Sequence, residues 1–506
     1  MTVATRIKVV LLLGLTLVAF VGSDGWFAIL DDESQFVTLA HQPLSATIDD
    51  YLYGDGQPEH PPLAGVLLHW WLPIGGSAQW SLRLPSILFF LTGLVGFALV
   101  ARRLAGDAAF VSLLWIGVLW PFGFHFGRLA DWYSLCFFLV AAITVAYLRY
   151  LERPTGLRFG AFLLAAVLLV YTTYYGWAIV GCLAIDLALV RRHRESMKFV
   201  GMTFGTLALA YVPLWRVFAG ELSYASKAEM LGSTAIFSRT LNALYNFYAL
   251  FVSESVAPWF WFASIPVSVG IAVSIVLLLY LLPKQHRRYL IYFALLFTGL
   301  VILNIETTKR LLFFSGWLLV SFALALANTE RPMQRRFLAL VLALVGAVGW
   351  AGVLARDYYA VPHFIEPWAA IADDAASMVN KGGMVVSNST SFLFSMNYAL
   401  YRLGLVKASS VPGWVEHPAV LKVDHWFATN LTGKSRVLFV KGVNNTLEVE
   451  TASTAMWLAT NCVAGNVRQL VPDTGYALKA RFFPDAAQLP YRITLMEYDC
   501  SGVPPR

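Results

Sequence analysis

The residues Asp31-Asp32-Glu33 form an acidic cluster shortly after the first long apolar run of the chain, inside a segment that covers residues 24–81. A connection of this length without a membrane span of its own is usually either functional or disordered. Aromatic residues such as Trp26 and Trp70 are frequent in it, whereas acidic disordered segments contain few of them. We therefore interpret the segment as a functional loop and its acidic cluster as a candidate catalytic site.

The composition outside this loop identifies the class of protein. Of the 506 residues, 58% are hydrophobic and 13% are charged, and the mean hydropathy is +0.64. Soluble domains carry about 25% charged residues. These values predict an integral membrane protein. The net charge of +7 follows from the basic loops described below, so it does not indicate nucleic acid as a partner.

Apolar runs long enough to cross a bilayer recur along the first two thirds of the chain. A transmembrane helix needs about 20 such residues, and by this measure the chain contains about eleven runs. They cover residues 7–23, 82–104, 108–126, 129–150, 158–174, 176–190, 198–218, 258–282, 289–305, 310–328 and 335–355. The first run has no clear cleavage site of the kind that ends a signal peptide, so we interpret it as a retained span.

Basic residues at the ends of these runs predict the orientation. Lys and Arg collect in cytoplasmic loops, and here most of them fall on the same side as Arg6 and Lys8. This pattern places the N-terminus in the cytoplasm. The loop at about 24–81 and residues 356–506 then lie on the exterior side of the membrane.

The chain changes character after residue 355. Residues 1–355 form the predicted transmembrane domain, and residues 356–506 lack long apolar runs. In the second part, helical patterns at 364–380, 391–403 and 448–461 alternate with strand-like segments at 384–386, 437–440 and 492–496. Such alternation predicts a small exterior α/β domain. Cys462 and Cys500 both fall in it, and an oxidising compartment would permit a disulfide, but two cysteines do not prove one.

The chemistry available at the outer face restricts the substrates. No nucleotide-activated donor is normally available there, so a transferase needs an activated group carried by a membrane lipid. A carboxylate can act as general base towards an acceptor hydroxyl, and Arg binds phosphate through its planar fork. The outer loops supply both kinds of group: Asp31, Asp32, Glu33, Glu59 and Asp131 as carboxylates, His60 as a histidine, and Arg83, Arg128, Lys309 and Arg310 as cations.

Several of these residues lie in motifs that resemble a known family. The motifs are Asp32-Glu33 after the first span, His60-Pro61-Pro62-Leu63, Arg83-Leu84-Pro85-Ser86 opening the second span, Arg128-Leu129-Ala130-Asp131-Trp132-Tyr133 opening the fourth, and Lys309-Arg310-Leu311-Leu312 at a late span. Together they resemble the bacterial branch of the GT-C glycosyltransferases. This is the family 39-like group that is related to protein O-mannosyltransferases and to the aminoarabinose transferase of lipid A. The resemblance is clearest over residues 20–190.

The resemblance implies a polytopic α-helical GT-C fold and a polyprenyl-phosphate-sugar donor. It also implies an acceptor hydroxyl and inversion at the anomeric carbon. Asp32 matches the catalytic aspartate of the family, and Glu33 matches its acidic neighbour. His60 stands where many members have His or Lys before the Pro-Pro pair. Asp31 is an additional carboxylate, so whether Asp31 or Asp32 is the base remains open. The acceptor implied is an envelope lipopolysaccharide, another glycolipid or a glycan, and less readily a protein.

Other interpretations compete with this one. Acidic residues at the end of a span are often only a solvated boundary, and Arg83 could be an interfacial anchor. Carboxylates with a histidine also suit Mg²⁺ or Mn²⁺, but no tight ligand spacing occurs, so we assign no metal residues. A transporter or flippase of a lipid-linked sugar is the main alternative function, although such proteins carry polar groups at mid-membrane. A non-catalytic envelope assembly protein is a further one.

Overall fold

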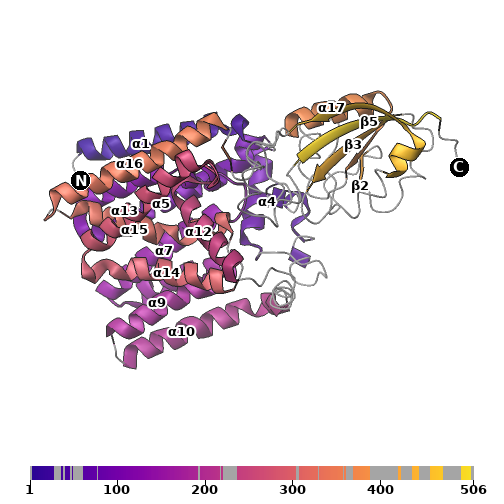
Figure 1. Ribbon diagram of the computed structural model, residues 1–506. Coiled ribbons are helices and arrows are strands. Elements are labelled where there is room, and N and C mark those ends of the chain that lie inside the picture. The colour runs from indigo at the N-terminus through magenta and orange to yellow at the C-terminus, as the bar shows by residue number, and fades with distance from the viewer. Residues whose placement is uncertain are drawn as a thin grey trace.

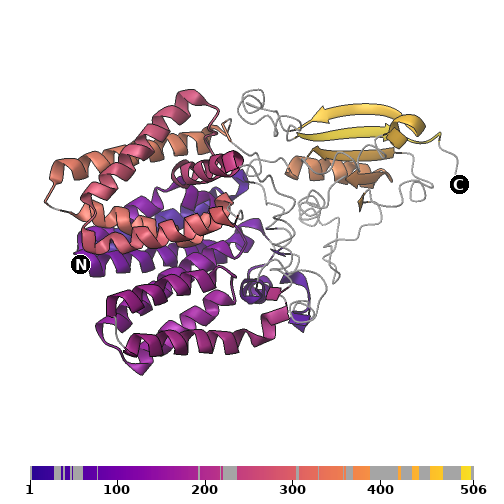
Figure 2. The ribbon, with the colours of Figure 1, turned by 60° about the horizontal axis from the view of Figure 1, so that its bottom comes forward.

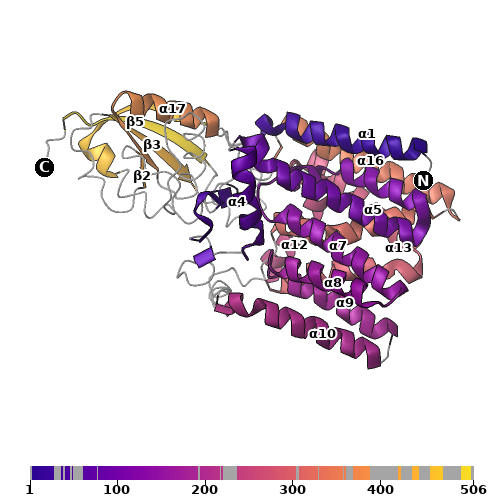
Figure 3. The ribbon, with the colours of Figure 1, turned by 180° about the vertical axis from the view of Figure 1, so that it is seen from behind.

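The structure is a computed structural model of the 506-residue chain. It describes all residues except 1–2, 28–32, 34–35, 38–39, 46–47, 50–60, 77, 192–193, 217, 220–235, 304–306, 329, 357, 360–367, 388–419, 423–435, 444–455, 471–491 and 503–506. The described residues form a large helical bundle, and a smaller β-sheet lies beyond one end of it (Figure 1). The turned view in Figure 2 and the view from behind in Figure 3 show the same separation between bundle and sheet.

The bundle consists of long apolar helices that run roughly side by side (Figure 1). Its first half contains α1 (Val3–Gly22), α4 (Leu63–Gly75), α5 (Gln79–Val118), α6 (Pro121–Phe126), α7 (Tyr133–Glu152), α8 (Gly156–Val170), α9 (Gly176–Arg191) and α10 (Arg194–Tyr211). Its second half contains α12 (Ile236–Val252), α13 (Trp261–Leu281), α14 (Arg287–Ile302), α15 (Leu312–Ala327) and α16 (Pro332–Ala355). Short 3-10 turns include η1 (Asp24–Trp26) and η4 (Thr308–Leu311), beside η2 (Val212–Leu214) and η3 (Lys284–His286).

The predicted apolar runs all fall on helices of this bundle. Six of the described helices are long and apolar enough to cross a membrane: Gln79–Val118, Tyr133–Glu152, Met197–Leu214, Trp261–Leu281, Thr308–Ala327 and Pro332–Ala355. The remaining runs match shorter or less apolar helices, so the expected number of about eleven spans stays a prediction. The runs at 82–104 and 108–126 are joined in α5, which is interrupted at Ala105 and at Gly106, whose φ is +79°.

Helix α15 lies at the centre of the bundle. Its residues from Leu312 to Ala325 are all buried, and it packs against α5 and α7. The contact with α5 is close because Gly316 faces the ring of Phe97 with no room for a side chain. Small residues at such crossings let helix backbones approach, as is common in membrane bundles. The η4 turn at the start of α15 is thereby held in a fixed place.

The sheet outside the bundle has five strands in the order β2-β1-β3-β5-β4. The strands are β1 (Met384–Ser387), β2 (Val420–Lys422), β3 (Arg436–Val443), β4 (Val463–Gln469) and β5 (Arg492–Asp499). Strand β1 pairs in parallel with β2 and β3, whereas β5 pairs antiparallel with β3 and β4. Helix α17 (Trp368–Asn380) packs on β1 and β3. Three of these strands and α17 were expected, whereas β2 and β4 were not. The expected helix at 391–403 lies outside the described residues.

A disulfide closes the end of the β4–β5 pair. Cys462 precedes β4 and Cys500 follows β5, and their sulfur atoms are bonded. The strand register explains this bond. Val463 pairs with Asp499 in an antiparallel arrangement, so Cys462, which precedes Val463, lies opposite Cys500, which follows Asp499. Among the other cysteines, Cys136 is buried in the bundle and Cys182 is half-buried.

Candidate active site

A buried ion-pair network joins the first loop to helix α5. Arg83 lies one turn inside α5 and has no exposed surface. Its Nε donates to Glu33 Oε1 at 2.9 Å, and its Nη2 donates to Glu33 Oε2 at 2.7 Å. Its Nη1 donates to Asp24 Oδ1 at 2.9 Å. Because Glu33 is also fully buried, the network fixes the start of the first loop against the bundle.

The same carboxylate reaches a second segment of the chain. The backbone N–H of Ala130 donates to Glu33 Oε1 at 2.8 Å. Ala130 lies in the connection between α6 and α7, residues 127–132. Glu33 therefore ties the first loop, α5 and this connection together, although these parts are far apart in the sequence.

Arg128 is buried in the same connection. Its guanidinium carbon lies 3.9 Å from the ring centroid of Phe124, 4.6 Å from that of Phe27 and 5.2 Å from that of Phe20. Its Nη2 donates to Ser23 Oγ at 3.2 Å. Burial, together with the charge of Arg83, lowers the pKa of Arg128 to about 9, while nearby carboxylates act in the opposite direction. Arg128 therefore remains a cation near neutral pH.

The segment that leaves α16 also reaches this region. The His125 Nε2 and the Tyr359 hydroxyl are 2.7 Å apart, and the Arg356 guanidinium lies 5.9 Å from the Phe27 ring centroid. Burial raises the pKa of the Tyr359 phenol, so this group stays protonated and can donate its hydrogen. Sequence reasoning did not single out Asp24 or Tyr359 because nothing in the pattern pairs Asp24 with Arg83 or Tyr359 with His125.

The cations Lys309 and Arg310 lie on the η4 turn. Lys309 Nζ is 5.8 Å from the ring centroid of Tyr133, the first residue of α7. The Arg310 guanidinium is 5.7 Å from the ring centroid of Tyr175. A hydrogen bond of 2.9 Å from Thr308 Oγ1 to Asn246 Oδ1 ties the turn to α12. Both cations are partly exposed, so they can be reached by a ligand from outside the bundle.

Asp131 and its neighbours shape the surface between the two groups of charges. Asp131 Oδ1 accepts a hydrogen bond of 2.7 Å from the N–H of Trp132, which closes the turn that begins α7. Trp132 packs on Tyr175 and Phe313, with ring centroids 6.3 and 5.9 Å away. These rings form a rigid wall beside Arg310. Asp131 is half-buried.

The structure thus places six of the ten predicted site residues. Glu33, Arg83 and Arg128 belong to the buried region, Asp131 lies in the 127–132 connection, and Lys309 and Arg310 lie on the η4 turn. Asp31, Asp32, Glu59 and His60 lie outside the described residues. Within the part of the chain that the structure describes, no group of three or more His, Cys, Asp or Glu is arranged to hold a metal ion.

Comparison with solved structures gives the fold a class. The chain is similar to the crystal structure of ArnT from Cupriavidus metallidurans in the apo state, with a TM-score of 0.56 and 13% identity over 97% of this chain and 98% of that one. The structure of the same protein bound to undecaprenyl phosphate gives 0.55 and 13%, with 98% of both chains covered. An Archaeoglobus fulgidus oligosaccharyltransferase follows at 0.47 and 14%, over 77% of this chain and 61% of that one.

These likenesses run over nearly the whole chain for the first two structures. The chain therefore has the same fold as these two ArnT structures. No protein-family model and no curated protein matches the sequence. At 13% identity this likeness shows a shared fold, and a fold alone does not determine the activity.

Proposed function

We propose that this protein is a membrane glycosyltransferase that takes a sugar from a polyprenyl-phosphate donor and transfers it to a hydroxyl of an envelope acceptor. One observation carries the proposal. The 127–132 connection contacts the acidic first loop through Ala130 and Glu33, and α7, which follows it, contacts the cation pair through Tyr133 and Lys309. A carboxylate-bearing loop and a phosphate-binding pair are thereby held around one short segment.

The cation pair suits the phosphate of the donor. A departing polyprenyl phosphate carries negative charge, and Arg and Lys stabilise such charge, Arg through two parallel hydrogen bonds. Lys309 and Arg310 lie on the η4 turn that leads directly into the buried helix α15, so their backbone is anchored at the site. The similar ArnT structure with bound undecaprenyl phosphate supports a lipid of this kind as the donor carrier.

Glu33 and the neighbouring Asp32 have different roles in this proposal. Both oxygens of Glu33 are engaged by Arg83, and one also accepts from Ala130. A carboxylate held in this way is poorly placed to take a proton, so Glu33 is a positioning residue. The adjacent Asp32 is then the general base, with Asp31 as the competing candidate. This assignment rests on the sequence motif together with the fixed position of Glu33.

The reaction then follows from these groups. The acceptor hydroxyl oxygen attacks the anomeric carbon, and the proton of the hydroxyl passes to the Asp32 carboxylate. The bond between the anomeric carbon and the phosphate oxygen breaks, and its electron pair stays on the phosphate beside Lys309 and Arg310. Attack from the face opposite the leaving phosphate inverts the anomeric configuration. No metal ion is required by this scheme, and a divalent cation such as Mg²⁺ or Mn²⁺ would assist the same phosphate.

The acceptor and the location complete the proposal. Lipid-linked donors serve the outer face of the cytoplasmic membrane, where the first loop and residues 356–506 are predicted to lie. The acceptor would be a lipopolysaccharide, another glycolipid or a glycan of the envelope, with protein as a less favoured choice. The sugar transferred would be a hexose or a pentose.

Mass spectrometry of envelope glycolipids tests this function. A strain that lacks the gene should lose one sugar from an envelope glycan, and its polyprenyl-phosphate sugar should accumulate. Complementation with the wild-type gene should restore the sugar. A glycan profile that is unchanged by the deletion, with loss of lipid-linked sugar at the outer face instead, would favour the flippase.

A further inference from the structure

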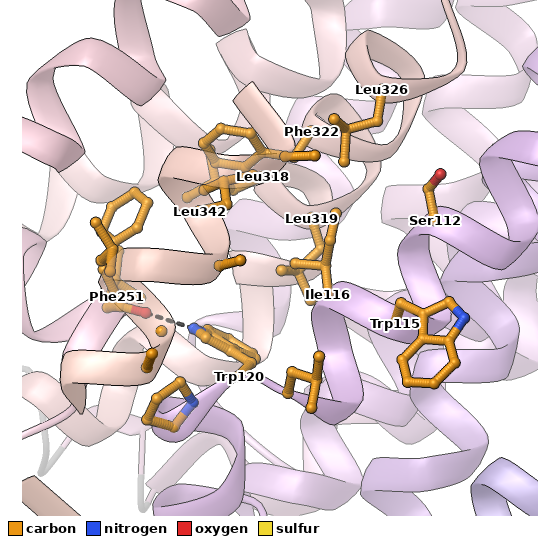
Figure 4. A pocket seen from close by; sticks show the side chains of 18 of the residues that line it. Ser112, Trp115, Ile116, Trp120, Phe251, Leu318, Leu319, Phe322, Leu326 and Leu342 are labelled. Carbon is orange, nitrogen blue, oxygen red and sulfur yellow. Dashed lines mark hydrogen bonds between the residues drawn. The ribbon is translucent and has the colours of Figure 1, made fainter. Parts of the chain in front are cut away.

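A large apolar cavity in the helical bundle lies away from the candidate active site. It has a volume of about 530 Å³ and is enclosed by α5, α6, α12, α15 and α16. Figure 4 shows side chains such as Ile116, Leu319 and Phe322 pointing into it from these helices. Small-molecule sites commonly have volumes of about 300–1,000 Å³. We call this cavity the α5–α16 groove.

The groove opens to the outer surface of the bundle. Trp115 and Leu119 form part of its wall and are 51% and 54% exposed. Trp115 lies on α5, which is long and apolar enough to cross a membrane, and Leu119 directly follows the last residue of this helix. In a bilayer, the open side of the groove would therefore face lipid and not water.

Three of the polar side chains in the wall of the groove form hydrogen bonds within the protein, and Ser112 adds a further hydroxyl. The indole N–H of Trp350 donates to Leu119 O at 2.7 Å, and that of Trp120 donates to Leu250 O. The Ser315 hydroxyl donates to Leu312 O. These three donors are already used, and apart from Ser112 the remaining side chains of the lining are apolar. The ligand that fits such a wall is a hydrocarbon chain.

The length of the groove matches one leaflet of a membrane. Along α16 its wall runs from Ala339 to Trp350, which is roughly 16 Å at a rise of 1.5 Å per residue. The hydrocarbon core of a bilayer is about 30 Å thick, so one leaflet contributes roughly 15 Å. Trp120 and Trp350 stand at one end, and tryptophan is typical of the membrane interface. A single acyl chain would extend from this interface to about the bilayer midplane.

We propose that the α5–α16 groove binds one acyl chain of a bilayer phospholipid. A polyprenyl donor fits less well because the groove and the cation pair lie on different faces of α15. Ser315 and Phe322 line the groove, whereas Phe313 stacks on Tyr175, the ring beside Arg310. A donor with its phosphate at Arg310 would direct its chain to the opposite side of this central helix.

A bound acyl chain would support the elements that hold the active site. The groove is lined by Pro121 at the start of α6, and α6 leads directly to Arg128. Trp350 also packs on Phe124 with ring centroids 4.6 Å apart, and Phe124 is the ring closest to the Arg128 guanidinium. The acyl chain is thus a neighbour of the buried network without contacting the substrates.

Photolabelling in nanodiscs tests the proposal. The protein is reconstituted in phosphatidylethanolamine and phosphatidylglycerol with a trace of phosphatidylethanolamine that carries a diazirine in its acyl chain. Gly346→Phe should fill the groove, since a Cβ at Gly346 would have no neighbour closer than 3.9 Å. Gly299→Phe is the matched control because Gly299 lies on α14, away from the groove, with nothing within 4 Å of a Cβ.

In the wild-type protein, the label should concentrate on peptides that cover residues 108–120 and 338–350. Gly346→Phe should reduce this labelling by about tenfold, which corresponds to roughly 1.4 kcal/mol, and Gly299→Phe should leave it unchanged. Gly346→Leu provides the same test with a smaller side chain if the phenylalanine variant does not fold. Equal labelling of the groove in all variants would overturn the proposal. So would displacement of the label by undecaprenyl phosphate, or protection of the groove by a second copy of the chain.

Discussion

Glu33 and Arg83 form a two-point ion pair in which neither side chain is exposed to solvent. Arg83 Nε lies 2.9 Å from Glu33 Oε1, and Arg83 Nη2 lies 2.7 Å from Glu33 Oε2. Such parallel bonds fix the plane of the carboxylate as well as its position. The residue before Glu33 is Asp32, so the pair anchors the chain directly beside the proposed base.

Removing the charge of Glu33 should therefore destabilise the protein. Glu33→Gln leaves Arg83 buried with an incomplete counter-charge, and breaking a buried pair in this way costs about 3–5 kcal/mol. Thermal unfolding of the purified variant in detergent should show a clearly lowered Tm.

The pair between Arg102 and Asp107 supplies the control for this variant. Its Nε–Oδ1 distance of 2.7 Å is the same as the shorter contact of the buried pair, but its side chains are 41% and 46% exposed. Exposed pairs contribute about 0–1 kcal/mol, so Asp107→Asn should have little effect. Equal Tm values for Glu33→Gln and Asp107→Asn would show that the buried network does not hold the loop.

Arg310 tests the donor-phosphate site. Arg310→Ala should raise the KM for the polyprenyl-phosphate donor more than Arg310→Lys, because lysine keeps the charge and loses the planar fork. Arg331→Ala is a suitable control, since Arg331 also lies over a tyrosine ring, that of Tyr280, at the opposite end of α15. Transfer kinetics with a fixed acceptor measure the effect. Wild-type kinetics in both Arg310 variants would remove this residue from the site.

The bond between Cys462 and Cys500 is measurable by thiol titration. Under denaturing, non-reducing conditions the protein should show only the thiols of Cys136 and Cys182. Replacing both bonded cysteines by serine should destabilise the sheet region by about 2–4 kcal/mol, because the unfolded chain loses a cross-link. Four titratable thiols in the wild-type protein would contradict the bond.

Reporter fusions test the orientation in the membrane. Fusions after Arg103 and Arg192 should report a cytoplasmic position, and fusions at Gly56 and after Lys381 should report an exterior one. The reason is the concentration of Lys and Arg on one side of the predicted spans. A cytoplasmic signal after Lys381 would mean that both the number of spans and the exterior position of the site are wrong.

The sequence predicts the bundle better than it predicts the site. Runs of apolar residues determine where helices form, and each predicted run falls on a helix. The strand β4 was missed because its residues Val463–Gln469 are exposed on every position, so no alternating pattern exists. The pairing of Arg83 with Asp24 was missed because packing of η1 against α5 brings them together, and no local pattern encodes that contact.

The interpretation of the site residues also changed in a way that the sequence could not provide. Glu33 was expected to be catalytic and Arg83 to bind substrate, on the basis of charge and motif. Neither residue has any exposed surface. A charged side chain that is fully buried in an ion pair is suited to a structural role, and the sequence does not reveal this burial. Lys309 and Arg310, in contrast, are partly exposed, and their role in binding the donor phosphate stays a prediction.

The rate of sugar transfer by the Asp32→Asn variant is the most direct test of the proposed function. The substitution is nearly isosteric and removes the base, and general-base catalysis contributes about 10²–10⁴-fold to the rate. The kcat for sugar transfer should fall by this factor while donor binding and Tm remain close to wild type. Asp31→Asn is the matched control and should cost less, because adjacent side chains point in different directions. An inactive Asp31→Asn beside an active Asp32→Asn would make Asp31 the base, and normal transfer in both variants would contradict a glycosyltransferase site in this loop.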